Sequence, residues 1–155
     1  METIFKKVHT GKDLLISGII TLAGVGLFFW NEGLGGVIGV CGLLMLLFYK
    51  AGYKANGEGP VLTKKAMDLS RSCFNSLVDY LSGKDVEPEL NDAALGAACR
   101  LEVYFNKEAG IAYAQLFDFS NYTYEKATEL VELHSPKTDK LLNKLPPVDK
   151  VDRCV

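Results

Sequence analysis

The chain has little of what catalytic and metal sites are usually built from. Its 155 residues include 2 His and 4 Cys, and the cysteines are scattered along the sequence. Such a set leaves almost no material for a histidine-based triad, a multi-histidine metal site or a disulfide scaffold. The phosphate-loop, HExxH, GxSxG, CxxC and GxGxxG motifs are also absent from the sequence. We therefore expect a non-enzymatic protein that holds no cofactor and no metal ion.

Charge is scarce in the first third of the chain. Between residues 14 and 49 the one charged side chain is Glu32. Two apolar runs flank it, Leu14–Trp30 with 17 residues and Leu34–Tyr49 with 16. A helix needs roughly 20 residues to cross about 30 Å of hydrocarbon, and neighbouring residues can supply the difference. We predict an α-helical transmembrane hairpin in a first domain over residues 1–55.

A buried hairpin and a signal peptide both fit the apolar runs less well. A helical hairpin buried in a soluble protein would need a polar face on each helix, and neither run has one. A secretory signal peptide should end in a small-x-small cleavage pattern, but none follows Trp30, and the second apolar run begins soon afterwards. A retained hairpin is the better interpretation.

The basic residues around the hairpin predict its orientation. Lysines flank the outer ends of both apolar runs, and the turn Asn31–Gly33 between them has none. Because basic residues stay on the cytoplasmic side of a membrane, we expect two spans with both termini in the cytoplasm. Thiols in that compartment remain reduced, so free thiols are expected at Cys73, Cys99 and Cys154.

Small residues in the apolar runs permit helices to approach closely. Gly35 and Gly39 form a GxxxG pattern in the second run, and Ser17 and Thr21 repeat the same spacing in the first. Close packing of this kind occurs within one hairpin and also between hairpins of different subunits. We name Gly35 and Gly39 as candidate oligomer-packing positions, with packing inside one hairpin as the alternative of equal weight.

The second domain, residues 56–155, is expected to be small and of the α+β class. Apolar residues recur at intervals of three and four from Leu62 to Leu81. This spacing predicts an amphipathic helix over Thr63–Ser82, with Thr63 as its N-cap and Gly83 just beyond its end.

The rest of the second domain is expected to contain a hairpin or a three-stranded sheet. Apolar and polar residues alternate over Cys99–Asn106, the turn residues 107–110 follow, and the return strand covers Ile111–Phe119. Residues 122–134 fit a third strand somewhat better than a helix. A short C-terminal helix is expected between Pro136 and Leu145.

The charge of the second domain excludes one class of partner and leaves another. It carries 12 Lys and Arg against 16 Asp and Glu, so duplex nucleic acid is not an expected partner. A small anionic ligand needs only a few donors and stacking faces. The alternative is that the tyrosines are half-buried strand residues and the cations are merely solvated. The candidate ligand-binding residues are Arg100, Tyr104, Asn106, Lys107, Tyr113 and Tyr122.

The whole layout resembles a known family of membrane effectors. The start MxTIFKKVHTGKDLLISG, the two apolar runs and the segment YFNKEAGIAYAQLFDF are similar to the small two-span CRISPR effectors of type III antiviral systems. That resemblance implies a cytosolic domain that binds cyclic tetra-adenylate, a nucleotide second messenger, and spans that then disturb the bacterial inner membrane. It carries over no individual ligand-binding residue.

Two functions are therefore expected from the sequence. The first is an oligomeric, ligand-gated membrane effector in antiviral defence, which opens a pore or disturbs the inner membrane. We expect a homotetramer, because a pore needs several hairpins and a cyclic four-fold ligand would match that symmetry. The second is a small membrane adaptor or regulatory protein whose cytosolic domain binds another protein.

Overall fold

The computed structural model describes residues 3–91 and 98–145. The chain divides into two compact units, Met1–Val61 and Leu62–Val155, so the division falls somewhat after the boundary predicted at residue 55. The thiol expected at Cys154 lies outside the described residues.

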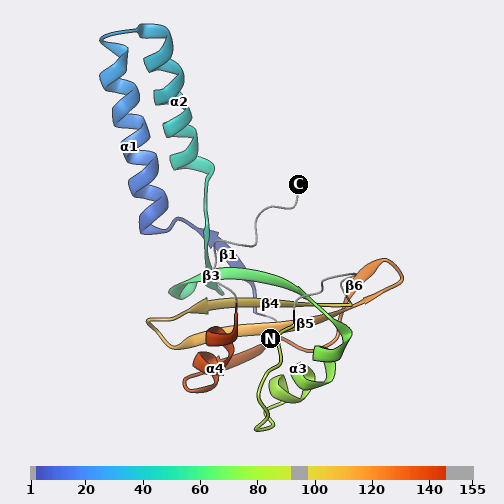
Figure 1. Cartoon of the computed structure of the whole chain (residues 1–155). Helices are drawn as coiled ribbons and strands as arrows, with labels where there is room; N and C mark the ends of the chain where they lie inside the picture. The colour runs from blue at the N-terminus through green and yellow to red at the C-terminus, as the bar shows by residue number, and fades with distance from the viewer. Residues whose placement is uncertain (1–2, 92–97, 146–155) are drawn as a thin grey trace. The chain divides into compact units, whose positions relative to one another are not determined.

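The first unit contains two antiparallel helices, α1 (Gly11–Phe28) and α2 (Glu32–Phe48), as Figure 1 shows. A capping box begins α1, in which the Asp13 amide donates to the Thr10 hydroxyl and the Thr10 amide donates to the Asp13 carboxylate. The Asn31 side chain caps α2 by accepting from the Leu34 amide at 3.1 Å. The caps explain why two helices form here with a short turn between them.

The two helices differ in their capacity to span a membrane. By length and composition α1 is a candidate span, although helices in soluble cores and signal sequences meet the same criterion. The second helix, α2, is apolar but has only 17 residues, so it is too short to count as a candidate span. The structure therefore supports one candidate span and does not establish two.

Three strands flank the helical hairpin in sequence: β1 (Phe5–Val8), β2 (Gly52–Ala55) and β3 (Glu58–Leu69). The first two pair antiparallel, with Phe5 opposite Ala55 and Val8 opposite Gly52. Positive φ angles of 52° at Asn56 and 81° at Gly57 make the two-residue turn between β2 and β3. The β1–β2 ladder thus brings together the segments that enter and leave the helical hairpin.

The described residues form a curled antiparallel sheet of seven strands. Its remaining strands are β4 (Cys99–Asn106), β5 (Ile111–Ser120), β6 (Thr123–Lys126) and β7 (Val131–His134). The strands follow one another in the order β1 to β6, and β7 pairs with β5. The predicted hairpin of residues 99–119 is confirmed as β4 and β5, with Gly110 at φ 64° in its turn.

Two helices cover one face of this sheet in the second unit. A 3-10 turn over Arg71–Cys73 leads into α3 (Phe74–Leu81), and α4 spans Lys137–Lys144. Gly83 follows α3 at φ 96°, as the sequence predicted for the end of a helix. The apolar core lies between these helices and β3, β4 and β5. Its largest fully buried members include Tyr80, Leu77, Leu101, Leu116 and Leu141.

The predicted fold class is wrong, because a large sheet replaces the small α+β domain. Residues 63–69 of the expected long helix pair with β4 along its length, from Thr63 opposite Phe105 to Leu69 opposite Cys99. Met67 and Leu69 face the core, and Ala66 lies half-buried on the other face. The helical spacing in the sequence was coincidental there, since pairing and burial in a sheet override a weak helix propensity.

The segment 122–134 also differs from its prediction. It contains the two short strands β6 and β7, both paired with β5, instead of a single third strand. The short C-terminal helix is present as α4, with Pro136 at its N-cap position.

Candidate functional site

The candidate site is the sheet face opposite α3 and α4, which we call the outer face. On β4 every second side chain is buried in the core, and the side chains between them are half-buried on the other side. Strand pairing aligns the neighbouring strands so that their outer residues lie beside these. We define the outer face by Lys64 and Asp68 of β3, Arg100, Glu102 and Tyr104 of β4, Tyr113 and Gln115 of β5, and Tyr124 of β6.

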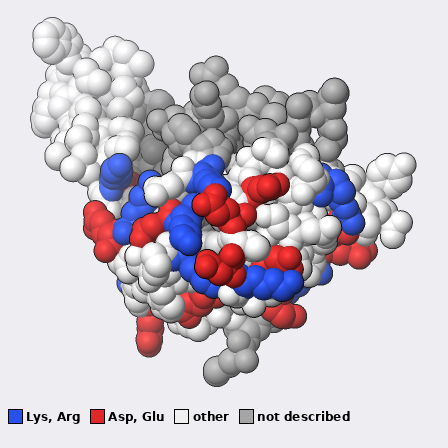
Figure 2. Space-filling view, turned by 60° about the horizontal axis from the view of Figure 1, so that its bottom comes forward, with Lys and Arg blue, Asp and Glu red and all other residues white. Residues whose placement is uncertain are grey.

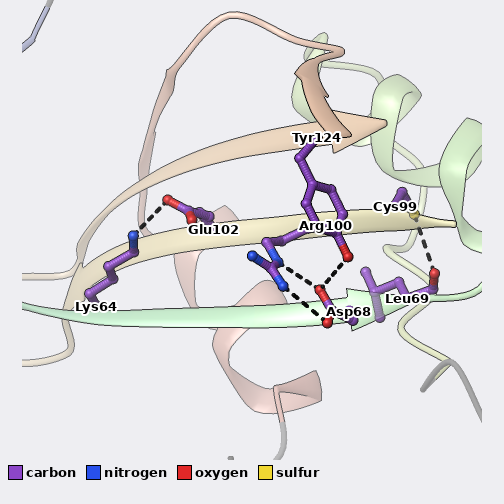
Figure 3. A network of polar contacts seen from close by, with 7 residues as sticks. All are labelled: Lys64, Asp68, Leu69, Cys99, Arg100, Glu102 and Tyr124. Carbon is purple, nitrogen blue, oxygen red and sulfur yellow. Dashed lines mark hydrogen bonds and ion pairs between the residues drawn. The ribbon is translucent and has the colours of Figure 1, made fainter. Parts of the chain in front are cut away.

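Arg100 is at the centre of a polar network on this face (Figure 3). Its Nε and Nη2 donate to the two carboxylate oxygens of Asp68 at 2.6 and 3.2 Å. The guanidinium carbon lies 4.2 Å from the centroid of the Tyr124 ring, and the Tyr124 hydroxyl donates to Asp68 Oδ1 at 3.2 Å. These hydrogen bonds from Arg100 lower the pKa of Asp68, so the pair is charged at neutral pH.

The contact between Tyr124 and Asp68 shows how strongly the sheet curls. β6 and β3 are three positions apart in the strand order, with β5 and β4 between them. In a flat sheet that separation is about 14 Å, yet the tyrosine hydroxyl reaches the carboxylate of β3. The sheet therefore bends so that β6 leans over the outer face, and the Tyr124 ring covers Arg100.

A second ion pair joins the same two strands, between Lys64 of β3 and Glu102 of β4. Lys64 Nζ is 2.9 Å from Glu102 Oε2 and lies 5.2 Å from the centroid of the Tyr104 ring. Tyr104 is directly opposite Tyr113 in the β4–β5 register. Lys64 and Arg100 are thus each paired with a carboxylate from the adjacent strand.

The structure brings together only part of the predicted ligand site. Arg100, Tyr104 and Tyr113 share the outer face, and Asn106 shapes the β4–β5 turn by accepting from the Ala109 amide at 2.9 Å. Lys107 lies in that turn.

Tyr122 lies at the other end of β5, in the β5–β6 turn, with 95% of its surface exposed. β5 has 10 residues, so Tyr122 and Lys107 are on the order of 30 Å apart.

Sequence reasoning missed the acidic half of the network. Asp68 and Glu102 hold the two cations, but Asp68 lies within the segment predicted as a helix, where it has no reason to pair with a strand residue. Asp68 could have been identified by treating Thr63–Leu69 as a strand. In a strand every second side chain lies on the same face, which places Lys64 and Asp68 together.

On the face of the molecule drawn in Figure 2, the described residues form no large region of one charge. On the face in Figure 2, Lys and Arg side chains alternate with Asp and Glu. One ion pair of the second unit joins Lys144 Nζ to Glu87 Oε2 at 2.9 Å. Among the described residues, no group of three or more His, Cys, Asp or Glu is placed to hold a metal ion.

Comparison with protein-family models, with curated proteins and with solved structures finds no match for this chain. Its function must therefore be inferred from its own residues. Two further features bear on that inference, the contact between the helices and the buried thiols.

Glycines in the helical hairpin lie where its two helices touch. A Cβ at Gly24 would overlap the backbone of Gly39, and one at Gly35 would overlap the backbone of Phe28. A Cβ at Gly42 would meet Thr21 in the same way. Gly35 and Gly39 therefore lie in the contact between the two helices of one hairpin, and their role in packing between subunits stays a prediction.

The two cysteines of the second unit that the structure describes, Cys73 and Cys99, lack the features of reactive groups. Cys73 and Cys99 are fully buried in the core and are not joined by a disulfide. Burial raises the pKa of the Cys99 thiol to about 11, with a smaller contribution from Cys73. A thiol with so high a pKa is protonated at neutral pH and is a poor nucleophile.

Proposed function

We propose that this protein is a membrane-anchored, non-enzymatic effector whose second unit senses a ligand. We call this second unit, Leu62–Val155, the sheet unit. The observation that carries the proposal is the exterior of the helical hairpin. Its buried residues are small or polar, such as Ser17, Gly24 and Gly42, whereas Leu22 is 72% exposed and Phe48 is 76% exposed. Water would disfavour such an exterior, and the hydrocarbon of a membrane would stabilise it.

The ends of the hairpin also suit a membrane. Trp30 is 93% exposed beside the turn, where an amphipathic aromatic side chain favours the interface between lipid and water. Helices of 17 and 18 residues are about 26 Å long, slightly less than the hydrocarbon thickness. Small mismatches of this kind are accommodated at modest cost. We propose two spans with both termini in the cytoplasm of a bacterial inner membrane.

The ligand that we propose is cyclic tetra-adenylate, as the family resemblance implies. The outer face offers a guanidinium for phosphate and half-buried tyrosines on which bases can stack. In this proposal four subunits associate, and ligand binding to the sheet units changes the arrangement of the attached hairpins. A hairpin without a polar interior cannot conduct alone, so a pore requires several copies.

A second candidate function is a membrane adaptor whose sheet unit binds another protein. One observation favours it: Arg100 and Lys64 are already paired with Asp68 and Glu102. A face whose charges are internally neutralised gives little attraction to a highly charged ligand.

The first experiment tests the anchor. The full chain should stay with the membrane fraction after alkaline carbonate extraction, and Leu22→Arg should release part of it, because Arg in mid-span costs about 3 kcal/mol. Leu22→Phe is the matched control and should remain bound. Full extraction of the wild-type chain would rule out membrane insertion.

The second experiment tests the ligand. The full chain in detergent should melt at a higher temperature with cyclic tetra-adenylate than with the linear tetra-adenylate, and dye should leak from vesicles only with the cyclic form. Membrane insertion without any response to cyclic oligoadenylates would favour the adaptor function.

A further inference from the structure

We infer that Asp68 is an internal substitute for the anionic group of a ligand, bound in the fork of Arg100 and covered by the β5–β6 hairpin. The inference builds on the proposed ligand-sensing function and specifies how its binding site is closed. It makes the outer face a gated phosphate site instead of an open one.

The geometry of the ion pair is the first support. Arg100 presents two N–H groups to two oxygens of one carboxylate. This is the arrangement in which a guanidinium binds phosphates and carboxylates of ligands. The side chains of Arg100 and Asp68 remain 35% and 42% exposed, so the ion pair lies at the surface and not in the core.

The cover is the second support. The Tyr124 ring lies on the guanidinium and its hydroxyl donates to Asp68, so this side chain ties β6 to the ion pair. β6 has only four residues and pairs on one side, with β5. A short strand at the end of a sheet has little to hold it and opens at low cost.

The turn that carries this strand is the third support. Asn121 and Tyr122 both have positive φ angles, of 50° and 61°. Glycine is the favoured residue at the second position of such a turn, and a bulky side chain with positive φ is strained there. The β5–β6 hairpin thus combines a strained turn with a strand of only four residues. This combination is better suited to a segment that moves than to a rigid edge of the sheet.

The replacement of the Asp68 carboxylate by a group of the ligand indicates which chemical class of ligand can bind. An incoming group must replace a carboxylate that already makes two hydrogen bonds, so a singly charged carboxylate has little advantage. A phosphate group carries more charge and more acceptor oxygens. Lys64 lies four residues from Asp68 along β3 and could take up further charge by leaving Glu102. The ligand class is therefore a phosphorylated small molecule.

The test compares two substitutions that remove the same charge. Asp68→Asn frees the Arg100 fork, whereas Glu102→Gln frees Lys64 and leaves the fork occupied. Binding of pyrophosphate and of cyclic tetra-adenylate to the full chain in detergent is measured by calorimetry at fixed salt. We expect Asp68→Asn to tighten binding of at least one probe about tenfold. Glu102→Gln should change it much less, and adding Arg100→Gln to Asp68→Asn should abolish the gain.

Tyr124→Phe gives a second measurement that does not alter charge. It removes the bond to Asp68 but keeps the ring, so binding should tighten by a few-fold and amide exchange in β6 should speed up. If Asp68→Asn does not fold, this variant decides the inference by the same two readouts. Equal gains from Asp68→Asn and Glu102→Gln would overturn the gated site, since they would show an effect of net charge alone.

The outcomes also separate this inference from the proposed function. If Asp68→Asn gains pyrophosphate binding through Arg100 but no variant binds a cyclic oligoadenylate, the phosphate site stands and the proposed messenger falls. If the wild-type chain binds cyclic tetra-adenylate and neither Asp68→Asn nor the added Arg100→Gln alters that affinity, the function stands and the gated site is wrong. A folded Asp68→Asn variant that binds neither probe would overturn the gated site.

Discussion

The two units of this chain distribute their residues in opposite ways. In the sheet unit large apolar side chains such as Leu77 and Leu101 are fully buried, and the described charged residues other than Lys65 are exposed or half-buried. In the helical hairpin the buried positions are Asp13, Ser17 and three glycines, and the large apolar side chains lie outside. A single sequence thus contains one segment suited to water and one suited to lipid.

The difference shows that the units depend on different forces. Burial of apolar surface stabilises the sheet unit, because water is excluded from its core. That force does not hold two helices together in hydrocarbon, where close backbone packing and hydrogen bonds must do so. The hairpin accordingly has close backbone contact between its helices at Gly24 and Gly39.

The largest effect is expected from truncating the core of the sheet unit. Leu101→Ala should lower the free energy of unfolding by about 2–5 kcal/mol, since it leaves a cavity among fully buried neighbours. Leu22→Ala removes the same atoms from the exposed exterior of α1 and should leave unfolding of the sheet unit unchanged. Denaturant unfolding in detergent, followed by near-ultraviolet circular dichroism, measures both. Similar losses in the two variants would contradict the contrast between the units.

A smaller effect is expected from filling the contact between the helices. Gly24→Leu should destabilise the hairpin by about 1–3 kcal/mol, because its Cβ overlaps the Gly39 backbone. Gly26→Leu is the control, since a Cβ there meets nothing within 4 Å. The control should be neutral or slightly stabilising through helix propensity. Thermal loss of helical circular dichroism in detergent compares the two, and equal melting would show that the helices do not pack as described.

The cap at the start of α1 should contribute less to the stability of the hairpin than the contact between its helices. Thr10→Ala removes the hydroxyl that accepts from the Asp13 amide and should cost about 1 kcal/mol. Amide exchange in the first turn of α1 should accelerate, while exchange in β4 stays the same. Thr10→Ser keeps the acceptor and should retain most of the protection. Acceleration of β4 in Thr10→Ala would mean that the two units unfold together.

Alkaline pH should act mildly and on the sheet unit alone. Burial raises the pKa of Tyr80, and burial followed by the nearby Asp68 raises that of Tyr124. The folded state favours the neutral form of both tyrosines. The stability gained in this way is complete below a pH of about 10, and it is lost as the pH rises through the raised pKa values of the folded state. Neither α1 nor α2 contains tyrosine. Unfolding measured across this range should show a loss that Tyr80→Phe reduces, and a loss unchanged by that variant would exclude Tyr80 as a source.

The sequence predicted the parts whose cause is local. The two apolar runs cover most of α1 and α2, and the alternation over Cys99–Asn106 is a strand as expected. Gly83 follows α3 as predicted, whereas the predicted N-cap Thr63 lies in β3.

The parts that were missed depend on pairing between distant residues. β1 and β2 are four residues each and pair across the whole helical hairpin, so neither has a pattern of its own. The helix predicted over β3 is wrong because the strand that pairs with it begins 30 residues after β3 ends. Asp68 and Arg100 are 32 residues apart, and only the register of β3 with β4 makes them neighbours.

The pairing of Val8 with Gly52 has a consequence for how this chain is assembled. Directly opposite residues of an antiparallel ladder have Cα atoms about 5 Å apart. Everything between them, including both apolar helices, is topologically a long loop at the end of an ordinary β-hairpin. A two-residue turn in place of residues 9–51 would restore that hairpin and leave every later strand in register. The helical hairpin is thus an insertion that can be removed as a cassette, which offers a direct route to the sheet without its two apolar helices.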